Sequence, residues 1–155
     1  MSSCLFCEFD SLAEKAVFTE TDKFRVILDP FPASFGHFLI VPRQHVEKID
    51  DVTTEEFSRV QDLIIKCKSI GKEQIEENYQ EILEFKPPEK SEKLISDALN
   101  SKKNPDGFNV GINEGEAAGQ TIDHLHIHVI PRYEGDVENP KGGVRNVIPD
   151  KADYT

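Results

Sequence analysis

The sequence has few cysteines, few basic residues and no long hydrophobic run. No apolar stretch approaches the roughly 20 residues that a membrane-spanning helix needs. The first residues lead into acids rather than into the basic and then apolar segments of a secretion signal. We therefore expect a cytoplasmic protein that does not associate with membranes.

Basic residues are outnumbered by acids, 18 to 29, which gives a formal net charge of -11. Such a charge disfavours electrostatic capture of DNA or RNA, so we expect no nucleic-acid partner and expect local donors to hold any anionic ligand. The cysteines, Cys4, Cys7 and Cys67, are too few and too unevenly spaced for the disulfide framework of a small secreted protein. A length of 155 residues with 37% hydrophobic residues fits one domain with one core.

Four short segments have the pattern of β-strands, because they are apolar, rich in branched or aromatic residues and bounded by Asp, Pro or Gly. They are residues 23–28, 36–41, 108–112 and 124–130. In the third segment Phe108, Val110 and Ile112 alternate with small or polar residues and therefore share one face.

A long helix is expected after the second strand. Thr53, with Glu56 three residues later, forms the capping-box pattern that begins a helix. Apolar residues then recur at the helical spacing that packs on a sheet: Phe57, Val60, Ile64, Cys67 and Ile70. Residues 72–104 are charge-rich with a thinner apolar stripe, and we expect a helical insertion there, within a single domain spanning residues 1–155.

The run HLHIHVIPR, residues 124–132, contains three of the five histidines. Alternate side chains of a strand share a face, so His124, His126 and His128 should project together while the apolar residues between them enter the core. Three histidines in register are improbable on an ordinary surface strand, so this face is predicted to be a functional site.

Two chemistries fit such a face. Closely spaced imidazoles can converge on a catalytic zinc ion, as in a metal-dependent hydrolase. Alternatively, a neutral imidazole can attack phosphorus if its second ring nitrogen is oriented. The preceding segment, GINEGEAAGQT, favours the second, because it supplies glycines for close backbone approach and side-chain donors for a phosphate. Asp123, the local candidate for a further metal ligand, would point away from the histidines in a strand.

At these residues the chain resembles the histidine-triad (HIT) superfamily of nucleotide hydrolases and transferases. The resemblance rests on the three alternating histidines together with GHFLIVP at 36–42 and AGQT at 118–121, and it extends over most of the chain. It implies an α+β HIT-like fold, in which a long helix packs on an antiparallel five-stranded sheet, and a homodimer.

The resemblance also implies roles for individual residues. His126, the middle histidine, would be the nucleophile that takes a nucleoside monophosphate from a purine nucleotide, and His124 and His128 would flank and orient it. Gln120 would hydrogen-bond near the bridging or leaving oxygen. The other substrate contacts would come from Asp29, His37, Asn113, Gly119 and Thr121, with Phe6, Leu28 and Pro30 as candidates for the base pocket.

Cys4 and Cys7 have the spacing of a zinc knuckle, but tetrahedral zinc needs two further ligands. Some bacterial members of the family bind structural zinc through such a pair, the histidine after a VPRQ-like segment and the first triad histidine. Here the last two positions are His45 and His124. The resemblance therefore implies structural zinc and no organic cofactor, the alternative being that the two cysteines are merely small hydrophobic residues near the terminus.

The resemblance leaves the substrate open. The segment PRYEGDVENPKGGVR is similar to bacterial members labelled dinucleoside tetraphosphate hydrolases, whereas the core motifs are shared with phosphoramidases that release AMP from amine conjugates. A nucleotide-binding sensor without turnover is a third possibility. Transferases have a different residue at the last histidine, so His128 favours hydrolysis. We predict cleavage at the α-phosphate of a nucleoside polyphosphate of the diadenosine polyphosphate type, through a covalent nucleotidyl-histidine.

Overall fold

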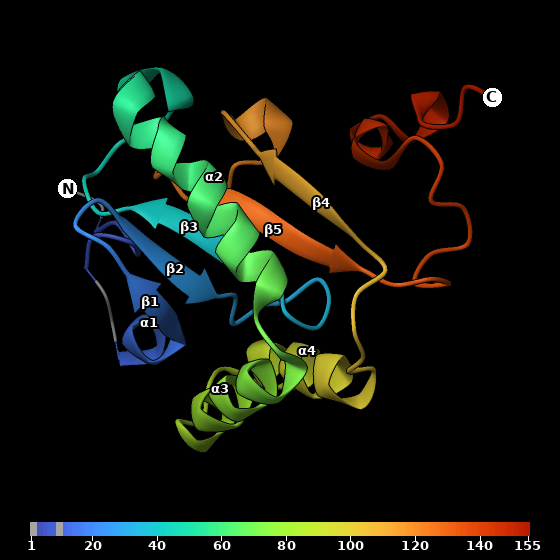
Figure 1. Ribbon diagram of the computed structural model, residues 1–155, viewed down its shortest axis with the longest axis horizontal. Helices are drawn as coiled ribbons and strands as arrows, with labels where there is room; N and C mark the ends of the chain where they lie inside the picture. Colours follow the sequence, from blue (N-terminus) through green and yellow to red (C-terminus); the bar gives the residue numbers. More distant parts are fainter. Residues whose placement is uncertain (1–2, 9–10) are drawn as a thin grey trace.

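The structure is a computed structural model that describes residues 3–8 and 11–155. Its centre is a five-stranded antiparallel sheet in the order β1-β2-β3-β5-β4, with helices around it (Figure 1). The α+β class and the five-stranded sheet predicted from the sequence are confirmed.

The strands are β1 (Val17–Glu20), β2 (Phe24–Leu28), β3 (Phe38–Pro42), β4 (Gly107–Ile112) and β5 (Ile127–Arg132). The helices are α1 (Ser11–Ala16), α2 (Thr54–Ser69), α3 (Lys72–Glu84) and α4 (Glu89–Asn100), with short 3-10 segments η1 (Ile49–Asp51), η2 (Glu116–Ala118), η3 (Gly143–Val147) and η4 (Pro149–Lys151).

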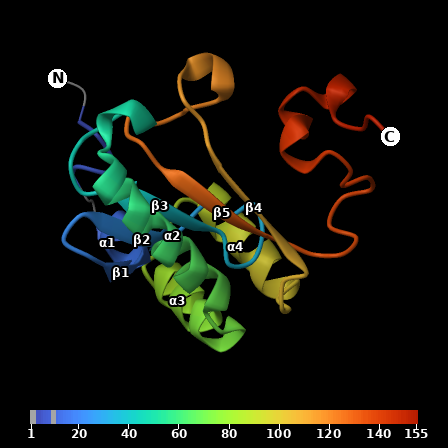
Figure 2. The same ribbon diagram turned by 45° about the horizontal axis from the view of Figure 1, so that its top comes forward.

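The strand register gives the sheet two different faces. Phe38 pairs with Val129, and both project toward the core on the face covered by α2 (Figure 2). Leu39 pairs with His128, so these two side chains project from the opposite face. The fold thus places α2 on one side of the sheet and the last histidine of the triad on the other.

The long helix α2 begins where the sequence predicts. Thr53 caps it by accepting a hydrogen bond from the Glu56 amide at 3.2 Å, and the Glu56 carboxylate accepts one from the Thr53 amide at 3.1 Å. Both bonds satisfy amides that the first helical turn leaves without an internal partner. The face toward the sheet buries Val60, Leu63 and Cys67, so the predicted packing of a long helix on the sheet is confirmed.

Residues 72–104 contain two separate helices rather than a continuation of α2. The backbone is extended at Ile70 and Gly71, with ψ angles of 129° and 146°, and this ends α2 before α3 begins. Helices α3 and α4 lie beyond the end of the sheet, where β2 leaves and β3 enters (Figures 1 and 2). Their buried apolar residues belong to the same core as the sheet: Ile75, Tyr79, Ile82, Ile95 and Ala98.

The predicted strand over residues 124–130 is wrong at its beginning, because β5 starts only at Ile127. The Leu125 amide donates to the Val46 carbonyl, and the His124 amide donates to the Ile122 carbonyl. These bonds hold the chain in a bend instead of in the β3 ladder. The first two histidines therefore precede the strand. The short strand β1 was not predicted at all.

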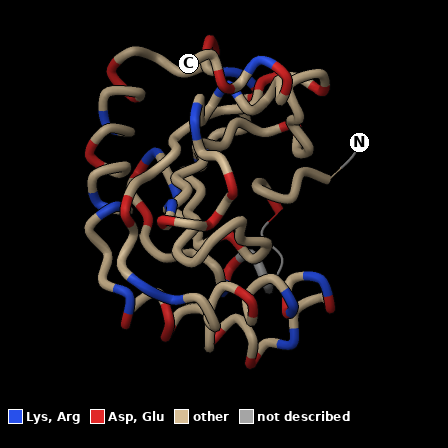
Figure 3. The backbone as a smooth tube through the Cα atoms, turned by 90° about the vertical axis from the view of Figure 1, so that its right-hand side faces the viewer, with Lys and Arg blue, Asp and Glu red and all other residues tan. Residues whose placement is uncertain are grey.

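The C-terminal segment, with η3 and η4, lies beside β4 and away from the other helices (Figure 1). Acidic and basic segments are interspersed over the outer parts of the tube in Figure 3. Within the described part of the chain, no helix combines the length and the apolar character needed to cross a membrane.

Candidate active site

A pocket of about 480 Å³ lies on the sheet face opposite α2. His126, His128, Asp29 and Thr121 supply its polar groups. Its remaining walls are apolar: Leu5, Phe6, Ile27, Pro30, Phe31, Leu39, Pro88 and Ile122. Apolar walls with a few converging polar groups are typical of small-molecule sites.

His126 is oriented by a backbone carbonyl. Its Nδ1 lies 2.8 Å from the carbonyl oxygen of His124, and because a carbonyl can only accept, Nδ1 must carry the hydrogen. In the neutral ring the lone pair is then on Nε2. The Phe6 ring packs on the imidazole at 5.5 Å between centroids. His126 therefore has the tautomer that a nucleophilic Nε2 requires.

His128 is oriented by a chain of hydrogen bonds from the loop before β3. The Ala33 amide donates to Nδ1 of His37 at 3.1 Å, so the hydrogen of neutral His37 is on Nε2. That Nε2 donates to Nδ1 of His128 at 3.0 Å. The hydrogen of His128 is thereby fixed on its own Nε2.

This Nε2 of His128 is buried and has no hydrogen-bond partner among the described residues. Buried donors normally have one, and His128 lines the pocket beside His126, with ring centroids 5.0 Å apart. An oxygen atom entering the pocket would supply the missing partner.

Burial keeps this pair neutral. It lowers the pKa of His37 to about 4 and the pKa of His128 to about 4, and the mutual repulsion that neighbouring imidazoles would feel if protonated acts in the same direction. Asp29 lies 3.5 Å from Nδ1 of His37, but burial raises the pKa of Asp29 as well. Because Nδ1 already accepts from Ala33 and His37 is neutral near pH 7, Asp29 and His37 form a contact rather than a salt bridge.

His124 points to the other side, away from the pocket. Its Nε2 donates to the Pro42 carbonyl at 2.8 Å, which leaves the Nδ1 lone pair free. This Nδ1 lies 3.4 Å from Sγ of Cys4 and 3.5 Å from Sγ of Cys7. Cys7 Sγ is also 3.2 Å from Nδ1 of His45.

These four side chains form a possible metal site, since their ligand atoms all lie within 4.8 Å of one another. Burial and the neighbouring Cys4 thiol raise the pKa of Cys7. Two thiolates side by side repel each other, and a divalent cation between them would relieve that repulsion. Two thiols with two imidazoles is a donor set that structural zinc prefers, so the residues fit the metal that the resemblance implies.

The loop before the triad is held by its own hydrogen bonds. Gln120 accepts from the Gly115 amide at 2.7 Å and donates to the Glu47 carbonyl at 3.2 Å. Among the residues that the structure describes, the pocket lining includes Thr121 but not Gln120, Asn113 or Gly119.

The residues that the resemblance suggests for the base pocket match the apolar wall only in part. Phe6 and Pro30 line the pocket as suggested, but Leu28 is fully buried on the other face, and its neighbour Ile27 lines the pocket instead. Strand parity could have found this, because Ile27 and Asp29 are two residues apart. Phe31 and the other apolar lining residues carry no comparable signal.

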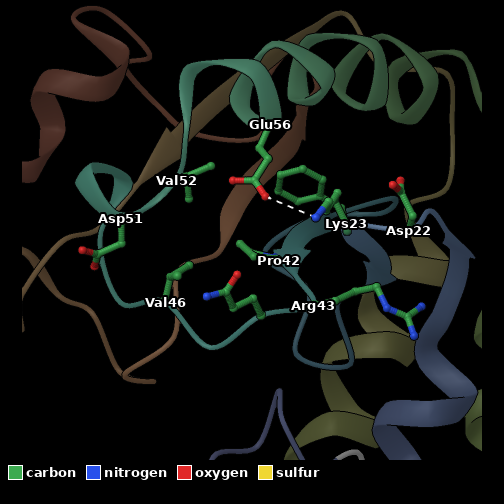
Figure 4. Close-up of a pocket in the computed structure, with 10 residues that line it drawn as sticks. Asp22, Lys23, Pro42, Arg43, Val46, Asp51, Val52 and Glu56 are labelled. Atoms are coloured by element: carbon green, nitrogen blue, oxygen red, sulfur yellow. Dashed lines mark ion pairs between the residues drawn. The ribbon is translucent and has the colours of Figure 1, made fainter.

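A second pocket lies between the α2 face of the sheet and the first turn of α2 (Figure 4). It contains the ion pair of Lys23 with Glu56, 3.6 Å apart, with Asp22, Arg43 and Asp51 nearby. Its charges are mixed and its lining includes no histidine, so this pocket offers no imidazole for attack on phosphorus.

The comparisons with known proteins point to one family. The family model described as HIT domain matches residues 11–135. The chain is 32% identical over 151 residues to an uncharacterized HIT-like protein of Methanocaldococcus jannaschii, covering 96% of this chain and 94% of that protein. It is 29% identical over 128 residues to a bis(5'-adenosyl)-triphosphatase of Dictyostelium discoideum, covering 83% of this chain and 67% of that protein. Among solved structures, it is similar to a Zn-bound histidine triad family protein from Mycobacterium smegmatis, with 27% identity, a TM-score of 0.58, and coverage of 88% of this chain and 80% of that chain.

Proposed function

The chain belongs to the HIT family and is a nucleotide hydrolase, and from this premise we propose that it cleaves nucleoside polyphosphates of the diadenosine polyphosphate type at the α-phosphate. The observation that carries the proposal is the tautomer of His126, whose Nδ1 hydrogen bond to the His124 carbonyl leaves Nε2 as a free lone pair in the pocket lining.

In the first step, Nε2 of His126 attacks the α-phosphorus. A P–N bond forms, the bond between phosphorus and the leaving-group oxygen breaks, and a nucleotidyl-histidine results. The positive charge that develops on the ring is stabilised by the bond from Nδ1 to the His124 carbonyl. Water then attacks the same phosphorus and breaks the P–N bond. A nucleoside monophosphate is released and His126 is neutral again.

His128 would stabilise the charge that grows on the phosphoryl or leaving oxygen. Its Nε2 carries a fixed hydrogen and is without a partner among the described residues. A donor already oriented toward developing charge is worth about 3 kcal/mol in the transition state. The neutral state that burial gives to His37 and His128 keeps this hydrogen in place near pH 7.

The remaining residues would bind the substrate. We assign the apolar wall around Phe6 and Phe31 to the purine base and the neighbouring Asp29 to the ribose hydroxyls. Thr121, which follows Gln120 in the sequence, lines the pocket. We propose that the loop carrying Gln120, together with Asn113 and Gly119, meets the phosphates and the leaving oxygen when substrate is bound.

We propose that Cys4, Cys7, His45 and His124 hold a structural zinc ion. Support comes from their donor set, from the free Nδ1 of His124, and from the Zn-bound relative of Mycobacterium smegmatis. When bound, zinc would supply a rigid tetrahedral link between the N-terminal segment and the triad. The hydrolytic steps are carried out by His126 and His128.

We also propose a homodimer. Strand β4 is an edge of the sheet, and exposed edges are normally covered in stable proteins. The nearby segment exposes Val144 by 63% and Val147 by 74%. A second copy could cover this apolar surface.

The decisive experiment measures AMP release from diadenosine triphosphate, diadenosine tetraphosphate and adenosine phosphoramidate, by chromatography and in the presence of a weak chelator. We expect the wild type to release AMP and the His126→Gly variant to be slower by at least about 1,000-fold, as for removal of other nucleophiles. A variant of the surface residue Ser58, Ser58→Ala, serves as the control and should match the wild type.

Each outcome bears on the proposal. Turnover by His126→Gly at the wild-type rate would refute the assigned nucleophile. Faster cleavage of the phosphoramidate than of either polyphosphate would replace the substrate class by amine conjugates. Tight AMP binding without turnover of any substrate would replace the hydrolase by a nucleotide sensor.

A further inference from the structure

We propose that helices α3 and α4 position the substrate-binding loop, residues 29–37, and that Ser91 and Tyr79 are its positioning residues. The inference rests on the proposed function, because the loop matters for catalysis only if the pocket binds a nucleotide. It gives the insertion of residues 72–104 a role in substrate affinity rather than that of a peripheral decoration.

The first contact is made by α4. Ser91 is completely buried, and its hydroxyl donates a hydrogen bond to the carbonyl of Pro30. Pro30 lines the pocket between Asp29 and Phe31, which line it too. Pro88, the residue before α4, also lines the pocket. The N-terminal end of α4 therefore both touches the pocket and fixes the backbone of its wall.

The second contact is made by α3. Tyr79 is completely buried, and its ring packs on Phe35 at 6.0 Å between centroids. Its hydroxyl has no hydrogen-bond partner among the described residues, so the contact with the loop is made by the ring. The ring packs Phe35, a loop residue, against α3.

The third contact shows how closely α3 and the loop approach each other. Gly36 has a φ of +87°, and a Cβ atom added there would lie 3.2 Å from Cδ1 of Ile75. The glycine is needed for both the left-handed backbone and the close approach. Helix α3 therefore holds the second half of the loop, as α4 holds the first half.

The loop connects these contacts to the chemistry. Its first residue, Asp29, and Phe31 line the pocket, and its last residue, His37, donates the hydrogen bond that orients His128. A loop that is free to shift would bind the nucleoside less well. It would also hold His37 less rigidly. Helices α3 and α4 should therefore affect nucleotide affinity most and the chemical step less.

The test compares Ser91→Ala with Ser101→Ala. Both serines donate to backbone carbonyls, but Ser101 donates only to Asp97 and Ala98 of its own helix. We expect Ser91→Ala to weaken AMP binding, measured by calorimetry, by about tenfold, because it leaves the Pro30 carbonyl without the donor that the buried Ser91 supplies. KM for diadenosine triphosphate should rise by a similar factor while kcat changes less than about twofold, the pattern of lost uniform binding. Ser101→Ala should change neither.

Amide hydrogen exchange of the unliganded protein gives a second readout that does not depend on turnover. We expect faster exchange across residues 31–37 in Ser91→Ala than in Ser101→Ala.

The proposal is overturned if AMP affinity and loop exchange in Ser91→Ala match those of Ser101→Ala. It is also overturned if exchange rises but affinity does not change, because the loop would then be held without consequence for binding. Absence of turnover in the wild type would refute the proposed hydrolysis but not this inference, since AMP affinity and exchange are measured without turnover.

Discussion

The contact between His37 and His128 determines which ring nitrogen is offered to the substrate. With Ala33 donating to one side of His37, each neutral ring has only one place for its hydrogen. The direction of donation along these hydrogen bonds is therefore set by a single backbone amide, that of Ala33, in the loop before β3. Protonation of His37 would place a second hydrogen on Nδ1 and remove the acceptor that Ala33 uses, while Nε2 would still donate to His128.

This arrangement predicts a pH dependence of stability. Burial lowers the pKa of His37 from 6.5 to about 4, so below pH 6.5 the unfolded chain binds a proton that the folded chain does not. The stabilisation is complete above pH 6.5 and is lost as the pH falls toward 4. Integrated over this interval, His37 should cost about 3 kcal/mol of the free energy of unfolding.

Urea unfolding between pH 7 and pH 4.5, compared for the wild type and His37→Gln, measures this loss. The variant should lose less stability over the range, because its side chain does not titrate. Asp29 acts in the opposite direction, since burial raises its pKa, but it is present in both proteins. Parallel curves for the two proteins would contradict the assignment.

The sequence grouped the three histidines in one region of the fold, but it predicted the directions of their side chains less well. The alternation of His126 and His128 identified the two rings that line the pocket. It failed for His124, because β5 begins at Ile127 and the backbone bends at His124 and Leu125, where alternation no longer decides the direction of a side chain. The hydrogen bond to Pro42 that turns His124 away joins residues 82 apart, and no local pattern encodes such a contact.

At the scale of elements, the contribution of the capping box at the beginning of α2 to stability can be tested directly. Thr53→Ala removes the side chain that accepts from the Glu56 amide, and should lower the free energy of unfolding by about 1 kcal/mol. Thr54→Ala is the matched control, because Thr54 is the exposed first residue of the helix. Chemical denaturation measures both. An equal effect of the two substitutions would mean that the cap does not contribute.

Elements with strong local signals were predictable, and those defined by distant partners were not. The capping box and apolar stripe of α2 act within a few residues. In contrast, β1 has only four residues, and its pairing with β2 contains a register shift between Val17 and Thr19. The position of α4 depends on contacts such as the one from Ser91 to Pro30, 61 residues apart. Composition marked residues 72–104 as unusual but could not indicate what they touch.

At the scale of the whole molecule, the apolar surface beside β4 predicts self-association. Val147→Asp places a charge on a side chain that is 74% exposed in the single chain. If a second copy covers this surface, light scattering should find a dimer for the wild type and a shift toward monomer for the variant. Phe85→Asp is the control, because Phe85 is also exposed, by 43%, but lies at the end of α3. A monomeric wild type would reject the dimer.

The proposed zinc site would join parts of the chain 120 residues apart, Cys4 and His124, so loss of its metal should affect the whole molecule. Phe6 lies between the two cysteines, and its ring contacts both His124 and His126. We therefore expect Cys4→Ser to lose bound zinc, to lower Tm by at least about 5 °C, given about 2–4 °C per kcal/mol for this size, and to weaken AMP binding.

The control is Cys67→Ala, because Cys67 is buried in α2, where burial raises its pKa to about 12 and makes it a poor ligand. It should keep one zinc per chain by elemental analysis and keep wild-type AMP affinity, although the lost packing will lower its Tm. Metal content thus separates the two cysteines where Tm alone cannot. A wild type purified without metal, with the AMP affinity of the zinc-loaded protein, would show that Phe6 is held in the pocket wall by packing and that the four ligands are not needed to form the site.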